Sequence, residues 1–259
     1  MSQSRASNIQ CTLIVSSCDN YSDLWVPFFK LLKIYWPDCP YQVLLITENK
    51  VFNDKGIISS KIGVNLDWST LLSRSLDLVK TPYVLFMLED FFIREVVETE
   101  KLEKILNNMN QSSIDMMRLI PFKGKSASHH LNTSIFNVIP LEARYRVSTQ
   151  GAFWKLKTLQ NLIKLGESPW EFEINGTKRS SVDETIIFAA VKTAILPYRH
   201  HVVERGEWFP WEAKRFKKMN IGCDFSKRNT MSWWISLIWI TRKYLSKFKN
   251  TIIDLWFKA

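Results

Sequence analysis

The sequence predicts an α/β protein with a central, mostly parallel β-sheet flanked by helices. The clearest observation is the run of residues 83–88, which is apolar without a break and follows a Thr-Pro turn. Such a run is typical of a strand buried on both faces of a parallel sheet. A strand, a helix and a second strand also follow one another within residues 9–47, which is the βαβ pattern. The hydrophobic content of 46% is sufficient for a full core.

The first βαβ unit carries a candidate binding loop. Residues 9–17 and 41–47 are rich in β-forming side chains, and residues 24–35 carry the single apolar stripe of an amphipathic helix. The polar turn after the first strand contains Asp19 and Tyr21. In an α/β sheet this loop is a place for a nucleotide, with a carboxylate for the base or ribose and a ring for stacking. A plain Asx turn is the alternative for Asp19.

Two carboxylates end the apolar strand. Glu89 and Asp90 follow directly after Leu88. Ligands of parallel sheets bind beyond the carboxyl ends of the strands, and carboxylates beside apolar surface are costly without a cation or hydrogen bonds. We therefore expect the pair to belong to a site. Solvated acids, or an acid that caps the next helix, are the alternative.

The second half of the chain contains a further candidate segment. Residues 148–154 lead into a predicted helix that ends near Gly166, and a loop over residues 167–173 follows. This loop combines three carboxylates with two aromatic side chains, which is unusual for a solvated turn; alternatively, the acids cap a helix or pair with Lys178 and Arg179. Asn175-Gly176 predicts a turn, and Ser180 or Ser181 predicts the start of another helix, with Ile186, Ile187, Ala190 and Val191 on its buried face.

The C-terminal fifth of the chain is basic. From Ala213 onward eleven residues are Lys or Arg and two are Asp, so this segment supplies nearly all of the net charge of +10. Residues 232–257 predict a helix with Trp and Phe on one face and Lys and Arg around it, which is typical of a segment lying in a membrane interface. A helix packed on its own domain or on a partner is the alternative.

Several classes are disfavoured by composition. The chain has 8 glycines and neither a GxGxxG nor a GxxxxGK[ST] motif, which disfavours a classical dinucleotide fold or a P-loop enzyme. Its four cysteines form no CxxC pair, as expected of reduced thiols in the cytoplasm. The pI of about 9.4 raises a nucleic-acid-binding module as a rival function, although the body of the chain is near neutral.

Three motifs in this order resemble a known family. They are Ser-Cys-Asp-Asn-Tyr-Ser-Asp-Leu-Trp (17–25), Phe-Met-Leu-Glu-Asp-Phe-Phe (86–92) and Glu-Ser-Pro-Trp-Glu-Phe-Glu (167–173). Over about residues 10–210 the chain resembles bacterial GT-A-type nucleotide-sugar glycosyltransferases of lipopolysaccharide, O-antigen and capsule gene clusters. The resemblance implies a GT-A-like (Rossmann-like) domain over 1–210 and a basic amphipathic membrane-associating segment over 211–259. The departure is a single acid pair in place of a full DxD motif.

The resemblance also implies roles for individual residues. Asp90, with His200, would bind Mg²⁺ or Mn²⁺ on the donor diphosphate, and metal independence, with basic residues in place of the cation, is the alternative. A general base for the acceptor hydroxyl would be Glu171, the first choice, or Glu173. The donor-binding residues would be Ser17, Asp19, Tyr21, Glu89, Gln150, Trp154 and Arg205. For Trp154, ordinary core packing is the alternative.

The resulting prediction is a glycosyltransferase of the hexosyltransferase type, assisted by a metal ion, that moves a sugar from a nucleotide-sugar donor, with a UDP-sugar favoured. The acceptor would be a lipid-linked or lipopolysaccharide glycan, and the enzyme would lie on the inner face of the bacterial inner membrane, attached to its anionic surface. The alternatives are a non-catalytic nucleic-acid-binding protein and a scaffold that keeps the fold without catalysis.

Overall fold

The computed structural model describes residues 10–200, 202–239 and 241. The contacts divide the chain into two units, residues 1–199 and 200–259, which are described separately. The functional boundary expected between residues 210 and 211 stays a prediction.

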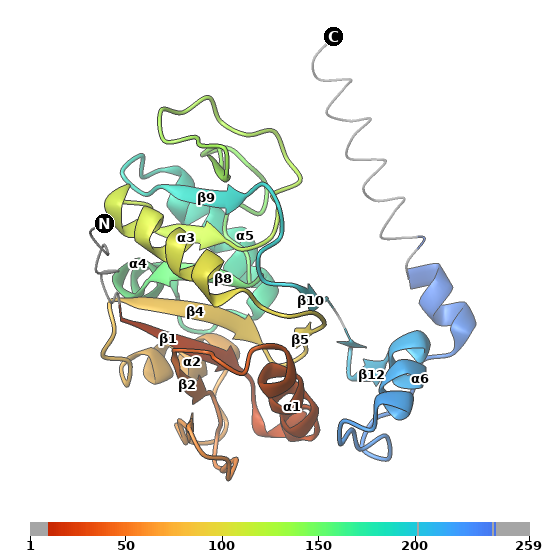
Figure 1. Ribbon diagram of the computed structural model, residues 1–259. Coiled ribbons are helices and arrows are strands. Elements are labelled where there is room, and N and C mark those ends of the chain that lie inside the picture. The colour runs from red at the N-terminus through yellow and green to blue at the C-terminus, as the bar shows by residue number, and fades with distance from the viewer. Residues whose placement is uncertain (1–9, 201, 240, 242–259) are drawn as a thin grey trace, which may run out of the picture. The chain divides into compact units, whose positions relative to one another are not determined.

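The described part of the first unit is built on one eight-stranded sheet (Figure 1). Its strand order is β3-β2-β1-β4-β8-β6-β9-β7. The strands are β1 (Cys11–Ser16), β2 (Gln42–Leu45), β3 (Ile57–Ser59), β4 (Tyr83–Leu88), β6 (Met116–Arg118), β7 (Phe136–Val138), β8 (Ala152–Lys155) and β9 (Phe188–Val191). A separate two-stranded pair joins β5 (Phe92–Ile93) to β10 (Tyr198–Arg199).

Strand register decides which residues meet at the edge of the sheet. β1 runs parallel to both β2 and β4, and Ser16 pairs with Leu88, so the carboxyl ends of β1 and β4 coincide. β8 is antiparallel to β4 and to β6, while β6 and β9 are parallel. The carboxyl ends of β4, β6 and β9 and the amino end of β8 therefore share one edge. The mixed α/β architecture confirms the predicted fold class.

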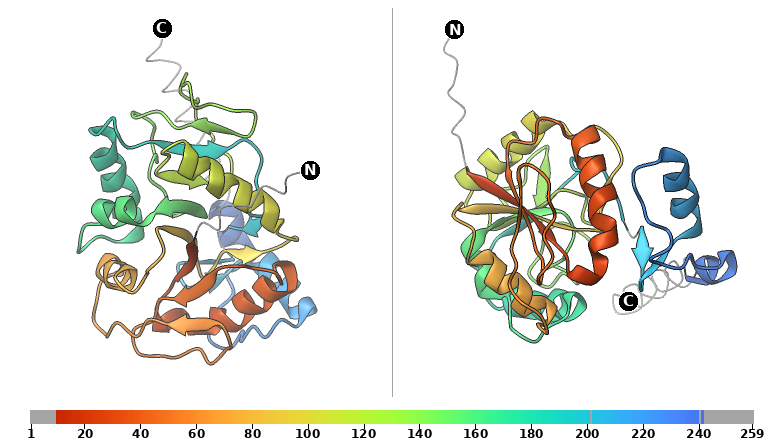
Figure 2. Two further views of the ribbon diagram at one scale, coloured as in Figure 1. Left: turned by 60° about the vertical axis from the view of Figure 1, so that its left-hand side comes forward. Right: turned by 90° about the horizontal axis from the view of Figure 1, so that it is seen from below.

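Helices cover both faces of this sheet (Figures 1 and 2). They are η1 (Asp19–Leu24), α1 (Trp25–Tyr35), α2 (Trp68–Leu76), α3 (Thr99–Gln111), α4 (Leu156–Leu162) and α5 (Pro169–Ser181). α2, α4 and α5 contact one another on one face, and α1 and α3 lie on the other. The central strand β4 is buried over Tyr83–Met87, as its unbroken apolar run predicts.

Three features of the second half differ from the sequence predictions. The loop expected over residues 167–173 is helical from Pro169 onward, because Ser168 caps α5 and Pro169 occupies its first turn. Asn175-Gly176 is not a turn, because α5 continues through it; a Cβ at Gly176 would meet Cγ1 of Val147 at 3.1 Å, so glycine serves close packing here. The helix expected from Ser180 or Ser181 onward is also wrong, since α5 ends at Ser181 and residues 188–191 form β9. β9 is buried on both faces between β6 and β7, and this pairing outweighs the helical spacing of its apolar residues.

The second unit contains a hairpin and a basic helix. Strands β11 (Val203–Glu204) and β12 (Glu207–Trp208) are antiparallel, and α6 (Pro210–Met219) follows. Residues 233–239 are helical, and the remainder of the amphipathic helix predicted over 232–257 lies outside the described residues except for position 241. Within the part of the chain that the structure describes, no helix has both the length and the apolar character needed to span a bilayer.

Candidate functional site

The acid pair lies beside the loop after β1. The backbone N–H of Glu89 donates to the carbonyl of Ser16 at 3.3 Å, which joins the end of β4 to the end of β1. Burial raises the pKa of the Cys18 thiol, and the negative charges of Glu89 and Glu48 raise it further. Glu89 is therefore near the loop that contains Asp19, as expected for residues at the carboxyl ends of neighbouring parallel strands.

Asp19 organises the loops at this edge. Its carboxylate accepts hydrogen bonds from the backbone N–H groups of Glu48, Asn49 and Lys50 at 3.0–3.1 Å, and its own N–H donates to Oε2 of Glu48 at 3.0 Å. These bonds fasten the loop after β1 to the loop after β2. A direct contact between Asp19 and a nucleoside stays a prediction, as does stacking on the half-buried Tyr21.

Ser17 and its neighbour Ser16 position two tryptophans. Oγ of the buried Ser17 accepts from Nε1 of Trp25 at 2.8 Å, and Oγ of Ser16 accepts from Nε1 of Trp68 at 3.0 Å. Trp68 lies 5.5 Å from Phe172 of α5, centroid to centroid. The end of β1 is thus connected to the helix that carries the predicted base residues.

An irregular segment, residues 145–151, crosses the same region and is held by side chains from several elements. Nη2 of Arg118 donates to the carbonyls of Tyr145 at 2.8 Å and Arg146 at 3.4 Å. The N–H of Val147 donates to Oγ1 of Thr177 at 3.0 Å. Buried backbone outside regular structure requires such partners, so this segment is a fixed platform that leads into β8.

Glu173 fastens the middle of this segment. Its Oε1 accepts from Oγ of Ser148 at 3.0 Å, from the N–H of Thr149 at 2.7 Å and from Oγ1 of Thr149 at 2.9 Å. All three of these bonds end on Oε1. The carboxylate of Glu173 is therefore held in one orientation.

Tyr198 fastens the far end of the segment. Its hydroxyl accepts from the N–H of Gly151 at 2.9 Å and donates to Oε1 of Gln150 at 3.0 Å, and its ring stacks on Phe91 at 4.6 Å. Burial raises the pKa of Tyr198, the Gly151 N–H and Arg118 lower it, and the negative charge of Asp90 raises it. Asp90, Tyr198 and Gln150 therefore belong to one polar cluster.

Arg118, the last residue of β6, was missed by sequence reasoning. It is 7% exposed, and its Nε–H is buried without an acceptor in the described part of the chain. Burial lowers the pKa of Arg118 to about 10, whereas the charges of Glu173 and Tyr198 raise it. A basic residue at the end of a short apolar strand was the available signal, since a buried cation requires a partner.

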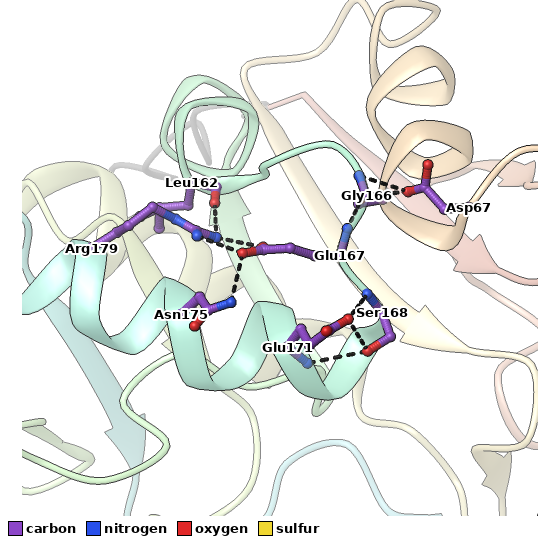
Figure 3. A network of polar contacts seen from close by, with 9 residues as sticks. Asp67, Leu162, Gly166, Glu167, Ser168, Glu171, Asn175 and Arg179 are labelled. Atoms are coloured by element: carbon purple, nitrogen blue, oxygen red, sulfur yellow. Dashed lines mark hydrogen bonds and ion pairs between the residues drawn. The ribbon is translucent and has the colours of Figure 1, made fainter.

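The opposite flank of α5 holds a different set of charges (Figure 3). Glu167 accepts two hydrogen bonds from the guanidinium of Arg179, each at 2.7 Å, and one from Asn175 at 3.0 Å. These hydrogen bonds lower the pKa of Glu167, and those from Arg179 contribute most. The carboxylate of Asp67 caps α2 and also accepts from the N–H of Gly166 at 3.1 Å, which ties the start of α2 to the loop before α5. The alternative of pairing with Arg179 is thus realised for Glu167.

Glu171 forms a capping box at the start of α5 (Figure 3). Its Oε2 accepts from the N–H of Ser168 at 2.8 Å and from Oγ of Ser168 at 2.7 Å, and these bonds lower its pKa. Residues two positions apart on an α-helix point about 200° apart. Glu171 and Glu173 therefore lie on different flanks of α5. Of the two, Glu173 contacts the 145–151 segment, through Ser148 and Thr149.

Three further predicted site residues remain, one in the core of the first unit and two in the second unit. Trp154 is 1% exposed, and its ring centroid lies 5.3 Å from that of Phe188. It therefore packs in the core, as the alternative interpretation expected. His200 and Arg205 belong to the second unit, so their positions relative to Asp90 are not described. Arg205 and Gly206 have φ of +51° and +82° and form the two-residue turn of the β11–β12 hairpin. The roles given to all three stay predictions.

A metal ion at this edge would find few ligands among the described side chains. Among the described residues, no group of three or more His, Cys, Asp and Glu side chains is arranged to hold an ion. Mg²⁺ at phosphate sites commonly takes one or two carboxylates and completes its shell with phosphate oxygens and water. The two carboxylates of Glu89 and Asp90 match this number of protein ligands.

Two cavities lie at the β7 edge of the sheet. One, of about 520 Å³, is lined by residues that include Lys125, His129, Glu142 and Ile186, and the other, of about 180 Å³, is lined by residues that include Phe122 and Lys192. Neither cavity is lined by Glu89, Asp90 or Glu173. The candidate site is therefore defined by its polar contacts rather than by these hollows.

Comparison with solved structures supports the fold. No family model matches the chain, and no curated protein matches its sequence. S. aureus TarS 1–349 in complex with UDP matches with a TM-score of 0.50 and 10% identity, over 82% of this chain and 64% of that chain. The same protein with UDP-GlcNAc gives 0.49 and 10%, over 73% and 57%. The galactosyltransferase LgtC, with donor and acceptor sugar analogs, gives 0.36 and 11%, over 59% and 60%.

This chain thus spans less than two thirds of the length of each of these structures. The similarity to the UDP complex is one of fold, and it agrees with the GT-A-like, Rossmann-like architecture predicted from the sequence.

Proposed function

We propose that this protein is a nucleotide-sugar glycosyltransferase. The observation that carries the proposal is one polar region at the carboxyl-end edge of the sheet. It contains the acid pair after β4, the loop after β1 and the carboxylate of Glu173. Tyr198 stacks on Phe91 and accepts from the N–H of Gly151, which joins the end of β4 to the segment that Glu173 holds. A UDP-sugar is the proposed donor, and the solved protein of similar fold is a UDP complex.

In this proposal the acceptor hydroxyl is activated by Glu173. The hydroxyl oxygen attacks the anomeric carbon, its proton passes to the carboxylate, and the bond from that carbon to the diphosphate oxygen breaks to release the nucleoside diphosphate. Asp90 and Glu89 would hold Mg²⁺ or Mn²⁺, which offsets the charge on the leaving diphosphate. Glu171, retained in the capping box, has a structural role.

The direct test is donor hydrolysis and binding by the full chain. We expect one UDP-sugar to raise the melting temperature in the presence of Mn²⁺ and to be hydrolysed slowly. Asp90→Asn should abolish turnover and leave the melting temperature of the ligand-free protein nearly unchanged. A wild-type protein that neither binds nor hydrolyses UDP, GDP, CMP or dTDP sugars would remove the proposal and favour the scaffold alternative.

We further propose a lipid-linked glycan acceptor of surface polysaccharide or lipopolysaccharide synthesis, reached from the inner face of the bacterial inner membrane. The support lies in the second unit. Exposed apolar side chains gather on the helical residues 233–239: Trp233, Trp234, Ile235, Leu237 and Ile238. Exposed cations gather on α6: Lys214, Arg215, Lys217 and Lys218. Apolar insertion and attraction to anionic head groups act together at a membrane interface.

Vesicle sedimentation tests the membrane proposal. We expect binding to phosphatidylglycerol vesicles and weaker binding to phosphatidylcholine vesicles. Replacing Trp234 and Ile238 with Ser should reduce it severalfold, whereas Val182→Ser, at an exposed apolar position of the first unit, should not. Equal binding by all three proteins, or preferential binding to duplex DNA, would contradict the proposal.

A further inference from the structure

The first turn of α5 carries a tryptophan that the core does not use. Trp170 is 68% exposed, whereas the other four tryptophans between residues 10 and 199 are buried or half-buried. We propose that Trp170 is an acceptor-binding residue, whose ring stacks on the pyranose that presents its hydroxyl to Glu173. This role rests on the proposed function, because only that reaction brings an acceptor hydroxyl to Glu173.

α5 begins at the edge of the sheet that holds the acid pair. The N–H of Glu167, in the loop before α5, donates to Oγ of Ser69 in the first turn of α2 at 3.0 Å. Trp68, the first residue of α2, donates to Oγ of Ser16 at 3.0 Å and lies 5.5 Å from Phe172, ring centroid to ring centroid. Ser16 ends β1 beside the end of β4. The first turns of α2 and α5 therefore lie at this edge.

Helix geometry relates Trp170 to Glu173. Residues three apart are neighbours on the surface of a helix, with Cβ atoms about 5–6 Å apart. At about 100° per residue, Trp170 is turned by about 60° from Glu173, away from the face that Phe172 buries. Helical side chains lean toward the N-terminus of their helix. The ring of Trp170 therefore lies on the solvent side of Glu173, toward the start of α5.

The 145–151 segment borders Glu173 on its inner side. Oγ1 of Thr177 accepts from the N–H of Val147, and Glu173, one turn nearer the start of α5, accepts from the N–H of Thr149. The segment thus runs toward the N-terminal end of α5 as it approaches β8. Glu173 has this buried segment on one side and the exposed indole of Trp170 on the other. A ligand that reaches Glu173 from solvent therefore passes beside the indole.

A carboxylate next to an exposed indole suits a pyranose ring. The C–H groups on one face of the sugar pack on an aromatic ring, and the hydroxyls around its rim bind polar groups that fix its orientation. All three hydrogen bonds that Glu173 accepts from described residues end on Oε1, so Oε2 is available to an acceptor hydroxyl. A single exposed apolar residue is common on protein surfaces, and it is the position of Trp170 beside Glu173 that indicates a sugar.

The kinetic test compares sugar transfer with hydrolysis of the UDP-sugar that the wild-type protein hydrolyses fastest. The acceptors are methyl glycosides of glucose, galactose and N-acetylglucosamine. Trp170→Ala should raise the KM for the best glycoside about tenfold, as loss of a binding tryptophan does. Hydrolysis, in which water is the acceptor, should keep its kcat and KM within about twofold. Trp170→Phe should recover most of the loss.

The matched control is Ile174→Ala, at a position of α5 that is 48% exposed and is turned farther from Glu173. Its KM for the glycoside should match that of the wild type. Both side chains are exposed, so the melting temperatures of all these variants should be nearly unchanged. Equal rises in KM for Trp170→Ala and Ile174→Ala would overturn the inference and indicate a general apolar docking face on α5.

Fluorine NMR tests the stacking without a donor. In protein labelled with 5-fluorotryptophan, each of the 11 tryptophans gives a signal, and the signal that Trp170→Phe lacks belongs to Trp170. The methyl glycosides should shift this signal. They should leave in place the signal of Trp234, which is 78% exposed and is assigned with Trp234→Phe. A Trp170 signal that no glycoside moves would overturn the inference even if the protein hydrolyses its donor. A shifted Trp170 signal without any hydrolysis would keep the sugar site and remove the transferase.

Discussion

Glutamates lie on two flanks of α5, and their hydrogen-bond partners differ between the flanks. On one flank the Glu167 carboxylate accepts hydrogen bonds from Arg179 and Asn175, and Glu171 closes a capping box on Ser168. On the other flank Glu173 uses one oxygen to hold Ser148 and Thr149 and lies near Arg118. The first flank is a closed structural network, whereas the second faces the polar region at the ends of β4 and β6.

This difference teaches that three acids within seven residues need not share a role. Acids on the closed flank stabilise helix ends and loops, and their removal should affect folding more than chemistry. Removal of the carboxylate of Glu173, on the other flank, should affect catalysis more than folding. Four substitutions or conditions test that division.

The largest effect is expected from Glu173→Gln. The amide keeps the size of the side chain but cannot take the acceptor proton, so kcat should fall about 10²- to 10⁴-fold. Glu171→Gln, the matched control on the same helix, should retain activity within about twofold. The measurement is donor turnover by both variants. Comparable losses in the two proteins would end the distinction between the flanks.

A loss of stability without a loss of chemistry is expected from Arg179→Met. The pair Arg179–Glu167 is mostly shielded, with side-chain exposures of 28% and 9%. Removing one partner leaves the buried carboxylate uncompensated, and we expect about 2–3 kcal/mol of destabilisation, below the figure for a fully buried pair. Urea unfolding gives this value. A variant as stable as the wild type would show that the network of Figure 3 contributes little.

A smaller change is expected from Ser168→Ala. Ser168 is the N-cap of α5, and its Oγ accepts from the N–H of Glu171 at 3.3 Å. Loss of an N-cap typically costs about 1 kcal/mol. The expected lowering of the melting temperature should come with an unchanged KM for the donor. A change in KM instead would connect this end of the helix to the site.

The smallest change in stability is expected from lowering the pH. The pKa of Glu167 is lowered from its ordinary 4.5, chiefly by Arg179. A carboxyl group with a lowered pKa in the folded state stabilises the protein above its unfolded pKa, and this stabilisation is lost as pH falls through the folded value. Unfolding midpoints of the wild type should therefore decline below about pH 4.5 more steeply than those of Glu167→Gln. Parallel declines would contradict the assignment.

The sequence alone determined the centre of the fold and one edge of the site. The apolar run over 83–88 is a local pattern, and it predicted both the buried strand β4 and the position of Glu89 and Asp90 at its carboxyl end. The βαβ pattern over 9–47 likewise predicted the parallel pair β1 and β2, and with it the loop of Asp19 beside the end of β4. Periodicity and strand ends are properties of neighbouring residues, so they can be read from the chain.

Only the tertiary structure decided which carboxylate faces that edge. The turn predicted at Asn175-Gly176 is overridden by packing of Gly176 against Val147, and the resulting helix places Glu171 and Glu173 on different flanks. Arg118 acquires its partners from residues 145–146, from α5 and from β10, which are remote in sequence. Such contacts depend on how the elements pack, because a side chain's local sequence fixes its direction on a helix or strand but not the residue it meets.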